Sequence, residues 1–511
     1  MDRAKALMFL GTGSDVGKSV LAAAFCRILK QEGFRVAPFK AQNMALNSFI
    51  TPEGGEMGRA QVVQAEAAGL EPHVDMNPIL LKPTSQMGSQ VIVLGRAVGN
   101  FSAKEYYEYK KELVTVVRGS FERLASSYDV IVMEGAGSAV ELNLKEHDLV
   151  NMAMADMADA KCILVGDIDR GGIFASLLGS LILLEPQERA RIGGFIVNKL
   201  RGDPRLFADG IDILESRSGL PVLGVVPYFD HIALPEEDSV ALGRRMERAD
   251  ASPDQNAIRI GVVRLPFISN YTDFDVFEQD PAVRLLYFDK PAEIFDFDAV
   301  ILPGSKNTIE DLAALCGTGM ADAISAFYKS GGTVVGLCGG YQMMGTVVRD
   351  PHGMESALPE IPGLGLLDME TEMLPDKVTS QVEAAVVAES GPFAGCRELL
   401  SGYEIHMGRS SSGGNSKSLF RILRRDGKSE SADDGLAQPD GRAWGTYIHG
   451  VFDNDEFRGR FLRELAKKSG KKLAPSDSFA YRGSRDKQYD LLAGLVRQHV
   501  NVRRVLDIIG M

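Results

Sequence analysis

The sequence predicts an α/β protein of two domains, each built around a parallel sheet that helices cover. The first third of the chain repeats a short apolar run, a Gly/Asp-rich turn and a helical pattern. A second series of the same kind begins at Ile258. Continuous apolar strands that alternate with helices are typical of a parallel sheet buried on both faces. A length of 511 residues also allows for two or more domains.

Composition narrows the class of protein. Apolar residues make up 45% and charged residues 24% of the chain, as in an ordinary globular protein. A net charge of −13 argues against nucleic acid as a partner. No apolar run reaches the roughly 18 residues of a membrane helix. The five cysteines lack the spacing of a disulfide framework, which indicates a reducing compartment. We therefore expect a cytoplasmic protein with no membrane partner.

The apolar runs set the domain boundaries. Residues 234–256 are rich in charged residues, Asp and Pro and have little apolar periodicity, which predicts a linker. We expect a first domain over residues 1–233, a second over 257–456 and a helical extension over 457–511. The strands predicted for the first domain are 6–10, 129–133, 162–165, 192–197 and 222–226, and those for the second begin at 258, 299 and 333.

A phosphate-binding loop is predicted between the first strand and the first helix. It reads Gly11-Thr12-Gly13-Ser14-Asp15-Val16-Gly17-Lys18-Ser19. Gly13 and Gly17 let backbone N–H groups turn toward a phosphate, and Lys18 adds a positive charge for the outer phosphates of ATP. Ser19 offers a hydroxyl to Mg²⁺. The spacing is a variant of the strict Walker pattern and is similar to the loop of dethiobiotin synthetase.

Polar residues at the ends of later strands are further candidates for this site. Glu134 is the candidate for a carboxylate ligand of Mg²⁺, and a solvated turn residue is the alternative. Asp167 and Asp169 end the next strand, and Arg170 beside them is suited to a transferring phosphoryl group or a substrate carboxylate. A structural ion pair is the alternative for Arg170. Asn198 is a candidate for the adenine edge, with a turn-capping role as the alternative.

The second domain contains a thiol in the sequence of a nucleophile elbow. Residues 336–342 read Gly-Leu-Cys-Gly-Gly-Tyr-Gln and follow an apolar strand. Small residues on both sides of Cys338 permit the tight turn, and the helix that follows favours the thiolate. The Gly339 N–H is placed to stabilise an oxyanion, and a second donor is expected from the loop at Gly304. These features predict Cys338 to be a nucleophile.

A thiol nucleophile needs a base, and the chain has seven histidines. His449 follows a late strand and precedes a glycine, which is where a triad base lies in a fold of this kind. His406 is the alternative.

The second domain resembles the class I (triad) glutamine amidotransferases, which have a flavodoxin-like fold. Cys338 matches their nucleophile and His449 their base. Most of that class carry a glutamate two residues after the histidine, and here that position is Val451. The third triad member is therefore open, with Asp453 or another nearby carboxylate as the candidates.

Five further stretches carry a resemblance over the whole chain: 39–48, 77–83, 166–172, 302–308 and 402–408. Through them the chain resembles the glutamine-hydrolysing adenosylcobyric acid synthases. That family implies ATP- and glutamine-dependent amidation of the b, d, e and g carboxylates of a corrinoid, adenosylcobyrinic acid a,c-diamide. Acyl phosphates and ammonia released from L-glutamine are the implied intermediates, and Asn43, Asn47 and Arg59 are candidates for the corrinoid side.

Two other readings compete with this one. Another amidoligase of the same architecture would amidate different carboxylates. A partition-type P-loop ATPase would bind a partner protein, but such proteins have no domain with a Gly-x-Cys-Gly-Gly motif. The sequence leaves the oligomeric state open, an assembly of identical subunits included.

Overall fold

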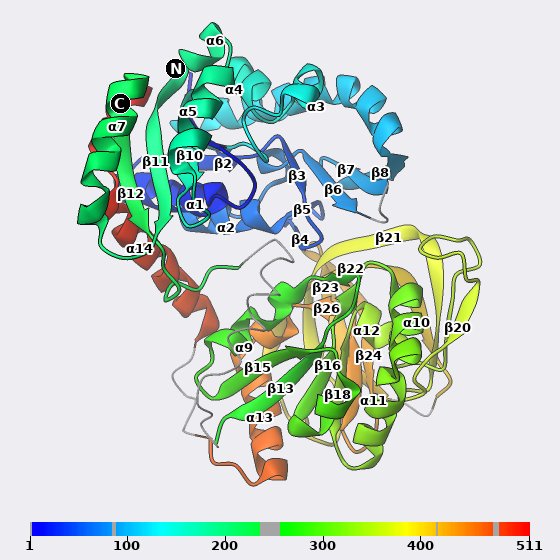
Figure 1. The fold of residues 1–511 in the computed structure, drawn as a ribbon. Coiled ribbons are helices and arrows are strands. Elements are labelled where there is room, and N and C mark those ends of the chain that lie inside the picture. The colour runs from blue at the N-terminus through cyan, green and yellow to red at the C-terminus, as the bar shows by residue number, and fades with distance from the viewer. Residues whose placement is uncertain (1–2, 84–87, 236–255, 415–416, 474–479) are drawn as a thin grey trace. The chain divides into compact units, whose positions relative to one another are not determined.

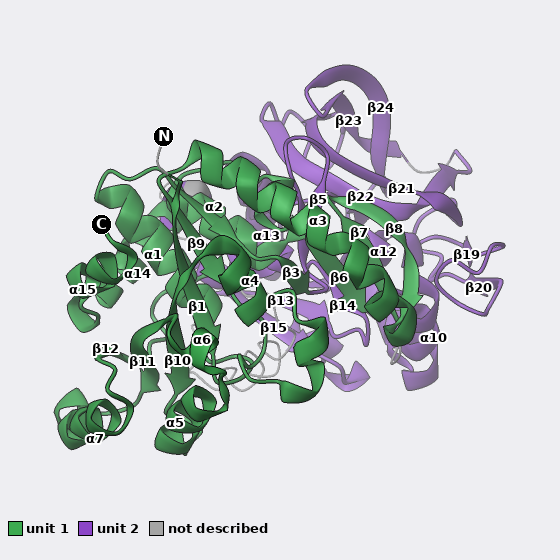
Figure 2. Cartoon of the chain, turned by 90° about the horizontal axis from the view of Figure 1, so that it is seen from above, with its two compact units in different colours: residues 1–44, 57–234, 485–511 green, residues 45–56, 235–484 purple. Residues whose placement is uncertain are grey.

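The computed structural model describes residues 3–83, 88–235, 256–414, 417–473 and 480–511. The chain forms two compact units, coloured separately in Figure 2. Unit 1 comprises Met1–Met44, Met57–Leu234 and Arg485–Met511, and unit 2 comprises Ala45–Glu56 and Pro235–Ser484. None of the described helices is both long and apolar enough to cross a membrane.

Unit 1 is built on a six-stranded parallel sheet with the strand order β12-β11-β10-β1-β9-β2 (Figure 1). The strands are almost wholly apolar because helices cover both faces of the sheet. All five strands predicted for this domain are present. The sheet strands are β1 (Lys5–Gly11), β2 (Val36–Phe39), β9 (Val130–Glu134), β10 (Lys161–Asp167), β11 (Ile192–Leu200) and β12 (Val222–Pro227).

The helices of unit 1 include two from the end of the chain. Leu7 and Phe9 of β1 lie in one buried cluster with apolar residues of α1, α14 and α15. The capping box of Ser102 and Glu105 starts α3. A small sheet of order β3-β6-β7-β8 completes the unit. The further elements are α1 (Lys18–Gln31), α2 (Arg59–Ala68), α3 (Ala103–Ser127), α4 (Met152–Ala158), α5 (Ile173–Leu183), α6 (Pro186–Arg189), α7 (Ala208–Ser218), α14 (Tyr481–His499), α15 (Val502–Ile509), β3 (Gln42–Met44), β6 (Ile79–Pro83), β7 (Gly88–Val93) and β8 (Arg96–Ser102).

Unit 2 is built on a mixed sheet whose parallel part has the order β15-β13-β16-β18-β25. Antiparallel strands extend it on the β25 side. Its strands are β13 (Ile258–Val263), β14 (Ile268–Ser269), β15 (Val283–Phe288), β16 (Ala299–Leu302), β17 (Gly304–Ser305), β18 (Thr333–Leu337), β19 (Val347–Arg349), β20 (Glu360–Pro362), β21 (Met369–Val386), β22 (Leu399–Ser412), β23 (Lys417–Arg425), β24 (Lys428–Ala437), β25 (Ala443–Thr446) and β26 (Ile448–His449). Its helices are α9 (Asp275–Gln279), α10 (Thr308–Thr318), α11 (Met320–Lys329), α12 (Gly339–Met343) and α13 (Asp455–Ser469).

The two units are less contiguous than the domains that the sequence predicts. The predicted extension over 457–511 is helical, but α13 belongs to unit 2 and residues from Arg485 onward belong to unit 1. The segment Ala45–Glu56, predicted within the first domain, belongs to unit 2 and contains β4 (Ser48–Ile50) and the start of β5 (Glu56–Gly58). The predicted linker 234–256 lies outside the described residues except at its ends.

Candidate active sites

The loop predicted to bind phosphate connects β1 to α1. Gly17 has φ 100°, a backbone conformation that favours glycine, and a Cβ there would lie 2.1 Å from Nδ2 of Asn198. The Lys18 Nζ donates to the carbonyl oxygens of Gly13, at 2.8 Å, and Gly137, at 2.9 Å. The Asn198 amide donates to the Val16 carbonyl at 2.8 Å, so its observed contact is with the loop itself.

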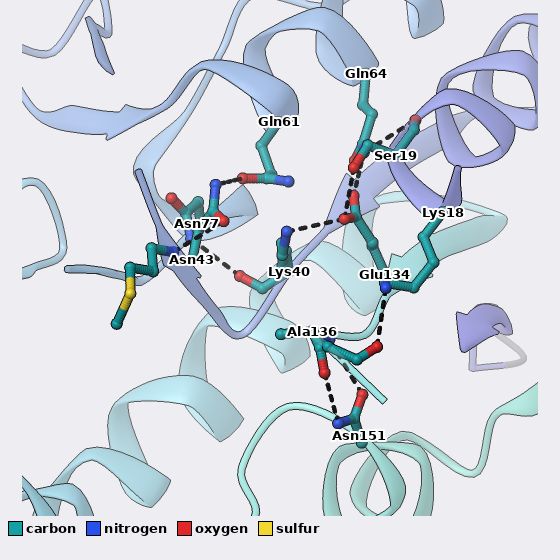
Figure 3. Close-up of polar contacts among 12 residues, drawn as sticks. Lys18, Ser19, Lys40, Asn43, Gln61, Gln64, Asn77, Glu134, Ala136 and Asn151 are labelled. Carbon is teal, nitrogen blue, oxygen red and sulfur yellow. Dashed lines mark hydrogen bonds and ion pairs between the residues drawn. The ribbon is translucent and has the colours of Figure 1, made fainter. Parts of the chain in front are cut away.

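Glu134 lies at the centre of a buried polar network beside the loop (Figure 3). Its Oε1 accepts hydrogen bonds from Ser19 Oγ and Lys40 Nζ, both at 2.8 Å, and its Oε2 accepts one from Gln64 Nε2 at 2.7 Å. Burial raises the pKa of Glu134, but Lys40, Ser19 and Lys18 more than offset this and lower the pKa below its usual range. The carboxylate of Glu134 is therefore ionised, and it contacts Ser19 in the first turn of α1.

Three carboxylates in and near the loop each form an ion pair with a cation. Arg170 pairs with a residue of the loop, and its side chain is 59% exposed. The sequence candidate Asp167 pairs with Lys199 of β11, and Asp169 pairs with Arg201, which follows β11. The pairs are Asp15–Arg170 at 3.0 Å, Asp167–Lys199 at 3.1 Å and Asp169–Arg201 at 2.7 Å.

The three candidates for the corrinoid side do not all belong to one unit. Asn43 and Arg59 belong to unit 1, where both are buried, and Asn43 Nδ2 donates to Gln61 Oε1 at 2.9 Å (Figure 3). Asn47 belongs to unit 2 and its Oδ1 accepts a hydrogen bond from the Tyr271 backbone N–H at 3.2 Å. Asn47 thus lies beside the residues that carry the second site.

Cys338 is held in the strained turn that a nucleophile elbow requires. It follows β18 with φ 49° and ψ −108°, values that a non-glycine residue seldom adopts. A Cβ on Gly340 would lie 2.0 Å from the Leu302 carbonyl oxygen, so only glycine fits there. A Cβ on Gly339 would lie 2.9 Å from the Ser305 backbone nitrogen. The turn after β16, which contains Gly304, therefore approaches the Cys338 turn closely, as the two expected oxyanion donors require.

His449 is fully buried between Cys338 and a carboxylate that the sequence did not identify. Its Nδ1 lies 2.7 Å from Oδ2 of Asp273, whose Oδ1 accepts the Gly450 N–H at 2.9 Å. Burial lowers the pKa of His449, but Asp273 and a hydrogen bond with Cys338 raise it more, to about 10. The order Cys338–His449–Asp273 is that of a catalytic triad, in which the acid fixes the imidazole tautomer. Asp273 occupies the place for which the sequence left Asp453 or another nearby carboxylate open.

His406, the alternative base, is engaged elsewhere. Its Nδ1 lies 2.8 Å from the Gly408 carbonyl oxygen, and its ring stacks on that of Tyr447 at 3.8 Å between centroids. The Tyr447 hydroxyl in turn contacts Gln342 of α12 and Ser410. His406 therefore packs against residues that support the elbow.

Two family models match the chain in the order of its two sites. The CobQ/CobB/MinD/ParA nucleotide binding domain matches residues 7–241, and the CobB/CobQ-like glutamine amidotransferase domain matches residues 259–457. A cobyric acid synthase of Syntrophobacter fumaroxidans is 72% identical over 510 residues, which cover 100% of this chain and 99% of that protein. The chain belongs to the cobyric acid synthase family. Members from Desulfitobacterium hafniense and Sorangium cellulosum are each 48% identical over 99% of this chain and 98% of their own length.

Membership of the cobyric acid synthase family confirms the predicted pairing of a nucleotide-binding domain with a glutamine amidotransferase domain. Three polar residues of the two sites had no predicted role: Lys40, Gln64 and Asp273. Lys40 lies within a stretch that carried the resemblance, and Asp273 follows the first strand of the second α/β series by ten residues. A search for carboxylates after every strand of that series would have included Asp273.

Proposed function

We propose that this chain converts adenosylcobyrinic acid a,c-diamide to adenosylcobyric acid by amidating its b, d, e and g carboxylates with ATP and L-glutamine. The observation that carries the proposal is the 72% identity, over the full length, to a cobyric acid synthase. A phosphate loop and a Cys-His-Asp arrangement within the same chain support it. One site is suited to activating a carboxylate and the other to releasing ammonia.

In the synthetase site, Lys18 and the loop N–H groups hold the ATP phosphates while a corrinoid carboxylate attacks the γ-phosphorus. The product is an acyl phosphate, which ammonia displaces. Ser19 and Glu134 would hold Mg²⁺, since hydroxyl and carboxylate oxygens beside nucleotide phosphates are its usual protein ligands. The ion would neutralise charge on the transferring phosphoryl group. Lys40 keeps Glu134 ionised and so maintains the carboxylate as a ligand.

In the glutaminase site, Cys338 gives its proton to His449 and attacks the glutamine amide carbon. Backbone N–H groups at Gly339 and near Gly304 stabilise the oxyanion. His449 returns the proton to the leaving ammonia, and water then releases glutamate from the thioester. Asp273 stabilises the imidazolium during both steps.

The acyl phosphate and the corrinoid would be bound by further residues of the synthetase site. The candidates are Arg170, Asp167, Asp169, Asn43 and Arg59. Asn198 would act on the nucleotide through the loop that it supports. We place the reaction in the cytoplasm, where ATP and glutamine are available. The corrinoid, ATP and glutamine are the partners of the chain, and nucleic acid is not among them.

Mass spectrometry of the corrinoid after incubation with enzyme, Mg-ATP and glutamine tests the proposal. Each conversion of a carboxylate to an amide changes the mass by a fixed amount, so four additions are expected. Cys338→Ser should lose the reaction with glutamine but keep it with ammonium chloride at alkaline pH. Amidation of a different set of carboxylates would refute the substrate assignment. If Cys338→Ser folds but does not amidate the corrinoid with ammonium, the assignment of ammonia release and carboxylate activation to two separate sites is refuted.

A further inference from the structure

The loop after β16 carries a lysine that the proposed mechanism does not use. β16 and β18 are neighbours in the parallel sheet, so the residues that follow them lie at the same edge (Figure 1). A Cβ on Gly339, directly after Cys338, would lie 2.9 Å from the Ser305 backbone nitrogen and 3.2 Å from Thr308 Oγ1. Lys306 lies between Ser305 and Thr308 in the sequence, so its backbone is next to the nucleophile elbow.

Hydrogen bonds on both sides of Lys306 fix the backbone of this loop. The Lys306 N–H donates to the Phe267 carbonyl oxygen at 2.9 Å. The Asn307 N–H donates to Ser305 Oγ, also at 2.9 Å, and Ser305 Oγ donates to Oδ2 of Asp311 in α10 at 2.5 Å. The loop therefore holds the side chain of Lys306 at a constant position beside the elbow.

Within the described residues, the ammonium group of Lys306 has no hydrogen bond and no ion pair. Lys306 is half-buried, and burial lowers the pKa of its ammonium below the ordinary value. Lys377, another cation that acts on this charge, is already paired with Glu56 at 2.5 Å. A cation held away from water costs free energy unless an anion compensates it. The Lys306 ammonium is therefore suited to an anionic ligand.

The carboxyl group of Glu355 is close to Lys306 but forms no ion pair with it. Burial raises the pKa of Glu355 to about 7, and Lys306 opposes this shift. Glu355 likewise opposes the effect of burial on the pKa of Lys306, which requires the two groups to be close. The same loop anchors Glu355, because its Oε2 accepts the Thr308 N–H and its carbonyl oxygen accepts from Asn307 Nδ2, both at 2.8 Å.

Lys306 and Glu355 lie near the thiol that glutamine must reach. Cys338, like Glu355, opposes the lowering of the Lys306 pKa by burial, so the thiol and the ammonium are close. Glutamine places its amide carbon at the thiol, and only a short aliphatic chain separates that carbon from the α-carboxylate and the α-ammonium. Both substrate charges therefore lie near the groups around Cys338. A lysine and a glutamate that are not paired with each other match the charges of this zwitterion.

We propose that Lys306 binds the α-carboxylate of glutamine and that Glu355 binds its α-ammonium, so that the pair selects a free amino acid for attack by Cys338. This rests on the proposed function, of which it concerns the glutaminase site alone. The bound zwitterion supplies an anion to Lys306 and a cation to Glu355. A glutamine residue within a peptide chain has neither charge and would leave both groups without a partner, so the site rejects it.

Two alkylating reagents separate recognition of glutamine from reactivity of the thiol. The diazoketone 6-diazo-5-oxo-L-norleucine carries both α-charges of glutamine and alkylates a thiol with loss of N₂, whereas iodoacetamide carries neither charge. Lys306→Met keeps most of the aliphatic side chain but removes the ammonium. It should slow labelling of Cys338 by dilute diazoketone roughly 100-fold and change the rate with iodoacetamide less than about threefold. Mass spectrometry of the Cys338 peptide measures both rates.

Three further variants complete the comparison. Glu355→Gln removes the charge for the α-ammonium and should slow only the diazoketone, roughly tenfold or more. Lys306→Arg should retain much of the labelling, since a guanidinium also pairs with a carboxylate. Lys329→Met is the matched control, because Lys329 is an exposed lysine at the end of α11, and it should react with both reagents as wild type does. In hydrolysis, Lys306→Met should raise KM for glutamine more than it lowers kcat.

The outcomes separate this inference from the proposed function. If Lys306→Met reacts with the diazoketone at the wild-type rate, the assignment of Lys306 is refuted. If it loses both reactions to the same extent, the ammonium acts on the thiolate rather than on the substrate, which also refutes the assignment. The same criteria apply to Glu355→Gln. None of these labelling reactions uses the corrinoid. If wild-type enzyme shows them but does not amidate the corrinoid with ammonium, the proposed function is refuted and the glutamine site stands.

Discussion

The carboxylate of Asp273 provides the sharpest test of the glutaminase site. Asp273→Asn keeps the size of the side chain but removes the charge beside Nδ1 of His449, 2.7 Å away. The amide also offers an N–H₂ group to Nδ1, which favours the wrong tautomer of the imidazole. The variant should therefore fold and bind glutamine but transfer the thiol proton poorly.

The size of the effect follows from the pKa of His449. Its ordinary value of 6.5 is raised to about 10 in spite of burial, which lowers it. At about 1.4 kcal/mol for each pKa unit, this corresponds to about 5 kcal/mol of stabilisation of the imidazolium, supplied mainly by Asp273. Only part of this is expressed in the transition state, so kcat/KM for glutamine should fall roughly 100- to 10,000-fold.

The assay compares glutamate release and corrinoid amidation from glutamine with amidation from ammonium. Asp273→Asn should lose the first two and keep the third, which shows that the synthetase site is intact. Asp453→Asn, at the position that the sequence offered, is the matched control and should stay within about threefold of wild type. A loss below about threefold in Asp273→Asn would refute the assignment of Asp273 as the third triad member.

The other predictions concern the remaining site residues and stability. Lys18→Ala should lower amidation roughly 100-fold or more with either nitrogen source, because the charge that holds the phosphates is gone; near wild-type turnover would contradict this. Glu134→Gln should raise the Mg²⁺ concentration for half-maximal amidation roughly tenfold, and an unchanged Mg²⁺ dependence would make Glu134 a structural residue. His406→Ala should retain a pH profile of glutamine hydrolysis like that of wild type, whereas selective loss of that reaction would transfer the role of base to His406. The pKa of His449 is higher in the folded protein than in the unfolded chain, so protonation of His449 stabilises the fold. This stabilisation is complete below pH 6.5 and is lost as the pH rises through about 10. The difference in melting temperature between wild type and Asp273→Asn should therefore narrow between pH 6.5 and 10, and a widening gap would contradict the sign of the shift.

Local patterns were enough to predict most of the parallel strands and the two loops on which the candidate sites are built. The strand before Gly11 and the helix after Gly17 identify the phosphate loop, because its geometry lies within nine consecutive residues. The Cys338 elbow is equally local. His449 could be chosen over His406 because a strand and a glycine flank it, and the contact with Asp273 agrees with that choice.

Contacts between distant parts of the chain could not be predicted in this way. Asp273 and His449 are 176 residues apart, and the usual position of the third triad residue holds Val451, which pointed to no replacement. The segment Ala45–Glu56 belongs to unit 2 through polar contacts and through packing of Ile50 on Tyr403, all with strands more than 300 residues later. Hydrophobic periodicity does not show which residues so far apart come together. The same limit applies to α14. The sequence shows which face of this helix is apolar, but it does not show which sheet that face packs against.

The last helices also impose an order on synthesis. Tyr489, Leu492 and Val496 of α14 are buried in the same cluster as Phe9 and Phe25 near the N-terminus. The ribosome makes all of residues 235–484 before these side chains emerge. At about 5–20 residues per second, the nascent first unit waits roughly 12–50 s without the part of this cluster that α14 and α15 supply. Unit 1 therefore cannot finish folding during synthesis before all of unit 2 has been made. A stop codon that removes α14 and α15 would leave unit 1 incomplete and exposed to chaperones and proteases.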